Sequence, residues 1–176
     1  MAYLVRKLIK RDKLSGLEDN GDIGDILADI PTTEFRTTNG TLSTWKIESI
    51  EDLDKAVLAI AVSSTEISKM DFIVIDTEMI KKHDLSYDYT YAGIDIPVPD
   101  LQNFHCDIMG ITMNKLTNCA CLYKEILDNE PDEGKYIVRY TAGEIRDLLR
   151  DAIKNNRVDR AKASGKIAEA IDKLSA

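Results

Sequence analysis

The chain is poor in the features that mark secreted and membrane proteins. Its 176 residues include 3 cysteines, an odd number that disfavours a disulfide framework and favours a reducing compartment. The longest uninterrupted apolar run, residues 56–62, is far shorter than the roughly 20 residues that a membrane helix needs. Basic residues interrupt the apolar positions near the N-terminus, where a signal peptide would need a hydrophobic segment. We therefore predict a cytoplasmic protein without a membrane span.

Motifs of nucleotide and metal chemistry are also missing. Gly165-Lys166 lacks both the earlier glycine and the following hydroxyl residue of a phosphate-binding loop. No dinucleotide fingerprint, nucleophile-elbow serine or zinc-spaced histidine pair is present. His105, Cys106, Cys119 and Cys121 are zinc-compatible, but one continuous helix would hold the two pairs about 21 Å apart. We therefore predict no cofactor and no metal, and interpret these four residues as packing residues.

The composition describes one acidic globular unit. Apolar residues make up 44% of the chain and charged residues 31%, enough for a hydrophobic core, and the net charge is −8. Basic residues gather towards both ends, whereas the middle of the chain is acidic. The negative charge disfavours non-specific binding to nucleic acid. We predict a single α+β domain over residues 1–156 and a C-terminal helical extension of the same domain over residues 157–176.

Alternating and turn-forming patterns predict the strands. A strand is expected over residues 3–9, a hairpin over residues 35–47 and a last strand over residues 136–140. Asn39-Gly40 favours the tight turn of that hairpin, because both residues tolerate positive φ angles. Residues 72–75 form an apolar, β-rich run between two aspartates, which is typical of a strand covered on both faces.

Helical spacing predicts the remaining elements. Helices are expected over residues 50–63, after the capping box of Thr141 and Glu144, and over residues 160–174. A helical turn is expected to end before Pro31, and a stripe with a period near 3.6 predicts one long helix over residues 100–127. The fold class is thus α+β, or α/β-like: a single mixed sheet of about four or five strands with a β-hairpin, packed helices and a helical C-terminus.

One enzymatic hypothesis comes from residues 72–78, where an apolar strand ends in Asp76-Thr77-Glu78. This pattern resembles the first motif of the DnaQ-like 3′-5′ exonucleases, and Asn103 with Asp107 has the spacing of that family's second motif. The resemblance implies a divalent-metal-dependent nuclease in which Asp76, Glu78 and Asp107 hold the metal ions. The alternative is a core strand whose end carries a helix-capping residue.

A second hypothesis concerns the tyrosine- and aspartate-rich residues 84–100, which contain no positive charge. Long irregular segments are often functional, and tyrosine offers a large contact area at little entropic cost. The predicted partner-binding residues are Asp84, Tyr87, Asp88, Tyr89, Tyr91 and Asp95. Together with the acidic turn at residues 128–133 they would suit a basic protein surface. The alternative is that the tyrosines cover a sheet edge while the aspartates only solvate the segment.

The leading functional prediction is therefore a non-enzymatic, acidic interaction module that binds a basic protein. An inhibitor, immunity or antitoxin-like protein, or an accessory protein of a bacterial defence system, would have this character. The alternative is the metal-dependent nuclease. A third possibility is a homo-oligomer assembled through the C-terminal helix, whose apolar stripe is too thin to stabilise an isolated helix.

Overall fold

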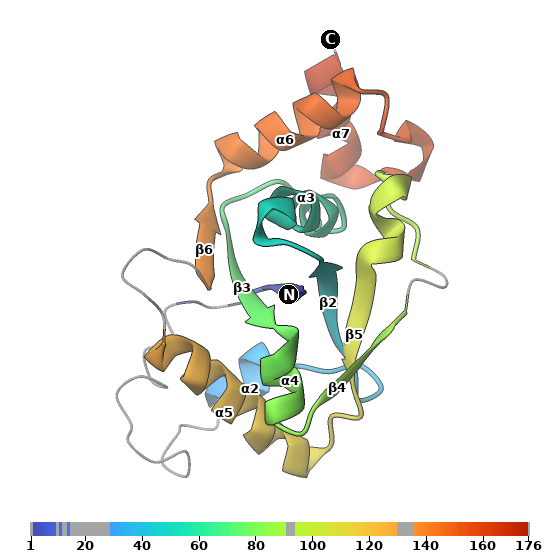
Figure 1. Ribbon diagram of the computed structural model, residues 1–176. Helices are drawn as coiled ribbons and strands as arrows, with labels where there is room; N and C mark the ends of the chain where they lie inside the picture. Colours follow the sequence, from blue (N-terminus) through green and yellow to red (C-terminus); the bar gives the residue numbers. More distant parts are fainter. Residues whose placement is uncertain are drawn as a thin grey trace.

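The fold is described by a computed structural model that covers residues 2–9, 11, 14, 29–90, 94–129 and 136–175 (Figure 1). The strands are β1 (Tyr3–Lys7), β2 (Leu42–Ile47), β3 (Met70–Asp76), β4 (Ser86–Tyr89), β5 (His105–Met109) and β6 (Ile137–Tyr140). The α-helices are α2 (Asp29–Glu34), α3 (Leu53–Val62), α4 (Thr77–Lys82), α5 (Met113–Asp128), α6 (Ala142–Lys154) and α7 (Gly165–Ser175). Short 3-10 helices are η3 (Ile50–Asp52), η4 (Pro99–Phe104) and η5 (Arg160–Lys162). The predicted α+β class and helical C-terminus are confirmed.

The strands form one sheet in the order β4-β5-β2-β1-β3-β6, and every pairing is antiparallel. The sheet therefore has six strands in the described residues, more than the four or five expected, and none of them pairs in parallel. The expected interior strand is confirmed as β3, between β1 and β6, with Phe72, Ile73, Val74 and Ile75 fully buried. Its continuous apolar run is explained by helices on both faces of the sheet.

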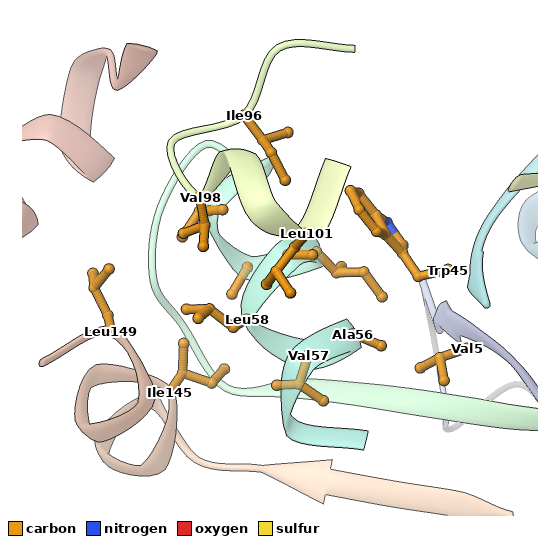
Figure 2. Packing of buried hydrophobic residues seen from close by; sticks show 14 of the residues in the cluster. Val5, Trp45, Ala56, Val57, Leu58, Ile96, Val98, Leu101, Ile145 and Leu149 are labelled. Carbon is orange, nitrogen blue, oxygen red and sulfur yellow. The ribbon is translucent and has the colours of Figure 1, made fainter. Parts of the chain in front are cut away.

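Two hydrophobic clusters hold these layers together. On one face, α3 packs between the sheet and α6, and Figure 2 shows Val57 and Leu58 of α3 near Ile145 of α6. Trp45 of β2 belongs to the same cluster. On the other face, residues of α5 and α4 pack against the alternate positions of β1, β3 and β5 (Figure 1). Because successive side chains of a strand point to opposite faces, β1, β2, β3 and β6 contribute to both clusters, whereas β4 and β5 contribute only to the second.

The C-terminal helix is part of this core. Ile167, Ala168 and Ile171 of α7 are buried in the cluster that contains α3 and α6. The preceding helix α6 begins with the predicted capping box, in which the Thr141 side chain accepts from the Glu144 N–H and the Glu144 carboxylate accepts from the Thr141 N–H. The thin stripe of α7 is therefore covered by its own chain, which removes the reason for expecting assembly through it.

The prediction of one long helix over residues 100–127 is wrong. This stretch contains η4, then strand β5, and only from Met113 the helix α5. Gly110 has a φ of 66° and separates β5 from the segment that leads into α5. Ile108 satisfies the helical stripe, but Cys106 and Ile108 also alternate with His105 and Asp107 as a strand requires. The pairing of β5 with β2 on one side and β4 on the other makes this stretch a strand and not part of a helix.

The hairpin and the turn before Pro31 are also corrected. Asn39 and Gly40 do adopt positive φ angles of 55° and 71°, but residues 35–38 form no strand, and only an isolated bridge joins Thr38 to Thr41. The partners of β2 are instead β1 and β5. Helix α2 runs through Pro31, which a proline in the first helical turn permits because its missing N–H has no intrahelical acceptor there.

Candidate functional site

The acidic tyrosine segment lies at an exposed edge of the sheet. Residues 84–100 were expected to be irregular, but Ser86 to Tyr89 form β4, the last strand beyond β5 (Figure 1). The cause is the alternation of Tyr87 and Tyr89 with Ser86 and Asp88, a period of two that the turn-rich flanks obscure. Within the described residues, β5 is the only strand that neighbours β4.

The backbone of Tyr87 points towards the open side of this edge strand. The Thr90 N–H donates to the His105 carbonyl, with a nitrogen–oxygen distance of 3.4 Å, so Thr90 directs its backbone towards β5. Bonded and non-bonded positions alternate in an antiparallel pair. The backbone N–H and C=O of Asp88 therefore point towards β5, whereas those of Tyr87 and Tyr89 point towards the open side of β4. The Tyr89 N–H already donates to Asp88 Oδ1 at 2.7 Å.

The two tyrosine side chains have different environments. Tyr87 is half-buried and packs against the cluster beneath α5. Tyr89 is 44% exposed, and its hydroxyl accepts a 3.0 Å hydrogen bond from Lys46 Nζ. That hydrogen bond raises the pKa of Lys46, whose charge is balanced by Glu48 Oε1 at 3.0 Å. Tyr89 is thus an exposed aromatic ring in a fixed position, and Tyr87 is largely a structural residue.

The predicted aspartates do not all share this surface. Asp84 lies in the turn before β4 with its carboxylate against Lys115 of α5, and Asp88 lies on β4 itself. Asp95 is held elsewhere, by a 2.6 Å ion pair with Lys162 of η5. Tyr91 and most of the acidic turn at residues 128–133 lie outside the described residues. The structure therefore places Asp84, Tyr87, Asp88 and Tyr89 at the β4 edge, with Asp88 on the opposite face of the strand from the two tyrosines, and separates Asp95 from them.

Asp88 faces a second carboxylate across the edge of the sheet. It is directly opposite Asp107 of β5, and Asp107 is in turn opposite Ser43 of β2. Directly paired residues share one face, where like charges destabilise a sheet. No lysine, arginine or histidine of the described residues forms an ion pair with Asp88. We therefore expect this pairing to be locally unfavourable.

The three carboxylates of the nuclease hypothesis are not assembled. Asp76 ends β3 and caps α4 by accepting a 2.9 Å hydrogen bond from the Glu78 N–H, as the capping alternative predicted. Glu78 is paired with Lys81 at 2.8 Å. Asp107 lies on β5, and strands β1 and β2 separate it from β3, a span of about 14 Å at normal strand spacing. The described residues contain no group of three metal-ligating side chains.

The zinc-compatible residues are also separated. His105 and Cys106 are consecutive on β5 and point to opposite faces of the sheet. Cys106 of β5 and Cys119 of α5 are buried where the helix packs on the sheet, and desolvation raises the pKa of each thiol to about 11. Cys121 is partly exposed on the same helix. Protonated, buried thiols are poor metal ligands and nucleophiles, which agrees with a packing role.

A polar group that the sequence did not reveal surrounds His105. Its Nε2 lies 2.6 Å from Ser43 Oγ and its Nδ1 lies 3.0 Å from Thr90 Oγ1. The carboxylate of Asp107 is 3.9 Å from Nε2. The Trp45 and His105 rings pack edge to face, with their centroids 5.0 Å apart. Burial lowers the pKa of His105, against the influence of Asp107 and of the Thr90 backbone, and so favours the neutral imidazole. Ser43 and His105 are 62 positions apart, and no local motif joins them.

Comparison of the chain with protein-family models, with curated proteins and with solved structures gives no match. No helix in the described part of the chain is long and apolar enough to cross a membrane. The geometry of the β4 edge and of the polar group around His105 is therefore what bears on function.

Proposed function

We propose that the protein is an acidic interaction module that binds an extended, basic segment of a protein partner along β4. The single observation that carries this proposal is the exposed edge strand, where the outward backbone of Tyr87 lies beside the uncompensated charge of Asp88. A segment added to such an edge gains main-chain hydrogen bonds, and its side chains meet those of the edge strand.

Charge complementarity selects the partner. A lysine or arginine opposite Asp88 would relieve its repulsion with Asp107, and a guanidinium could also stack on the exposed ring of Tyr89. Edge strands are usually protected by lysine, proline or a bulge, because an open edge invites pairing. Here the edge carries carboxylates, which discourage pairing with another copy of this acidic chain and favour a basic partner.

An inhibitor, immunity or antitoxin-like protein, or an accessory protein of a defence system, fits this chemistry, because each would recognise a basic protein surface. The free thiols of all three cysteines support a cytoplasmic location. We do not favour the nuclease alternative, since Asp76 and Asp107 lie on strands that two others separate.

The proposal is tested with matched charge reversals. Asp88→Lys places a cation at the β4 edge, and Asp151→Lys makes the same change on exposed α6. Each variant and the wild type are used as bait against host lysate, after each is shown to unfold in one cooperative thermal transition. We expect one basic protein to be captured by wild type and Asp151→Lys but not by Asp88→Lys.

Capture alone does not show which surface binds the partner. Hydrogen exchange of the protein is therefore measured with and without the purified partner. Protection of the Tyr87 amide from hydrogen exchange is expected on binding. A partner that binds all three baits equally, or that leaves Tyr87 unprotected, would show that β4 is not the binding surface.

A further inference from the structure

Outside the β4 edge, the group around His105 has the geometry of an activated serine. Ser43 is an exposed residue, whereas the His105 side chain is only 8% exposed and is held within the fold. The 2.6 Å separation of Ser43 Oγ and His105 Nε2 is a hydrogen bond. A nucleophile within hydrogen-bond reach of a base, and a third group that orients the base, is the arrangement used in covalent catalysis.

We propose that Ser43 is a nucleophile for acyl transfer, that His105 is its general base, and that Thr90 is a positioning residue for the imidazole. In the tautomer that this requires, Nδ1 carries the proton and donates it to Thr90, 3.0 Å away at Oγ1. The lone pair of Nε2 then faces the Ser43 hydroxyl. Burial favours the neutral imidazole, and in that state the lone pair is available to accept a proton.

The substrate class is an ester or thioester with a good leaving group. Ser43 Oγ attacks the carbonyl carbon, a carbon–oxygen bond forms, and the hydroxyl proton passes to His105 Nε2. The bond to the leaving group then breaks, and the leaving group takes that proton from the imidazolium. The carboxylate of Asp107, 3.9 Å from Nε2, stabilises the positive charge while it exists. The step involves no change of oxidation state.

The test uses a fluorophosphonate as the probe. Attack by Ser43 Oγ forms an oxygen–phosphorus bond, expels fluoride and leaves one stable adduct that peptide mass spectrometry locates. Ser86 of β4, which is also exposed, is an internal control on the same protein. A positioned general base contributes roughly 10²–10⁴-fold, so we expect Ser43 to react at least about 100-fold faster than Ser86.

Two variants separate base catalysis from simple exposure. Ser43→Ala should abolish the adduct, and His105→Gln should reduce labelling of Ser43 to the rate of Ser86 while the melt remains cooperative. Equal labelling of Ser43 and Ser86, no adduct at all, or labelling that His105→Gln leaves unchanged would overturn the proposal.

A measurement independent of reactivity checks the tautomer. The nitrogen chemical shifts of His105 distinguish a proton on Nδ1 from one on Nε2. We expect Nδ1–H in the wild type and a loss of that preference in Thr90→Val. A proton on Nε2 in the wild type would refute the assignment even if Ser43 were labelled.

Discussion

Replacing Asp88 by asparagine should stabilise the fold, because it removes one member of a repelling pair. Asp88 lies directly opposite Asp107 in the edge pairing of β4 and β5. The asparagine side chain keeps an oxygen that can accept from the Tyr89 N–H, as Asp88 Oδ1 does at 2.7 Å. The substitution therefore changes the charge while leaving the local hydrogen bond possible.

The size of the effect is set by cross-strand energetics. Directly opposed side chains on a sheet interact by roughly 0.2–1 kcal/mol, and the sign is unfavourable for like charges. In a chain of this size 1 kcal/mol corresponds to about 2–4 °C in melting temperature. We expect Asp88→Asn to raise the melting temperature by up to about 4 °C at low salt, and by less when salt screens the exposed charges.

The assay is urea denaturation of the wild type, Asp88→Asn, Asp107→Asn and the double variant. A double-mutant cycle isolates the interaction between the two sites from the separate effects of each change. We expect the second substitution to gain less stability than it does alone, since the repulsion has already been removed. A loss of stability in Asp88→Asn, or strictly additive effects, would refute the idea that these carboxylates oppose folding.

Other perturbations test the core, the acid limb and the C-terminus. Phe72→Ala removes a fully buried ring from the cluster beneath α3 and should lower the unfolding free energy by about 3–5 kcal/mol in urea titrations. The hydrogen bond from Lys82 lowers the pKa of Glu125 in the folded protein. The ionised Glu125 therefore stabilises the fold above its unfolded pKa, and this stabilisation is lost as the pH falls through its folded pKa. Glu125→Gln should therefore lower the melting temperature at neutral pH and have little effect in strong acid. Truncation after Asn156 removes Ile167 and Ile171, whose burial stabilises the fold by about 1.5–3 kcal/mol each. The truncated protein should have no cooperative melt.

The sequence predicted best those elements whose signal is local. The run Phe72 to Ile75 is apolar without interruption and became the buried strand β3. The Thr141 and Glu144 pair became a capping box because both of its hydrogen bonds lie within one helical turn. Helix α3 also follows its apolar spacing, from Leu53 to Val62.

Elements that depend on distant pairing were missed. Ile108 of β5 suits a helical stripe that continues on both sides of it, and only the pairing with β2 and β4 makes β5 a strand. β4 is short, and its two tyrosines and one aspartate are typical of a loop until β5 provides a partner. The contact of Ser43 with His105 depends on the register of β2 with β5, which no local pattern specifies.

The candidate site was predicted in part for the same reason. Asp84, Tyr87, Asp88 and Tyr89 are close in sequence and lie together at the edge. Asp95 is nearby in sequence but is drawn away by Lys162, whose position depends on the packing of the C-terminal helices. Local composition indicated the surface, whereas tertiary contacts set its limits.

The most direct test of the central claim is site-specific photo-crosslinking in the host cell. Tyr89, which is 44% exposed on β4, is replaced by p-benzoylphenylalanine, and exposed Glu51 of η3 is replaced in the same way as a control. We predict one discrete adduct with a basic protein from position 89, absent from position 51 and lost when Asp88→Lys is added. The absence of an adduct at position 89, or the same adducts from both positions, would contradict the proposal that β4 is the binding surface.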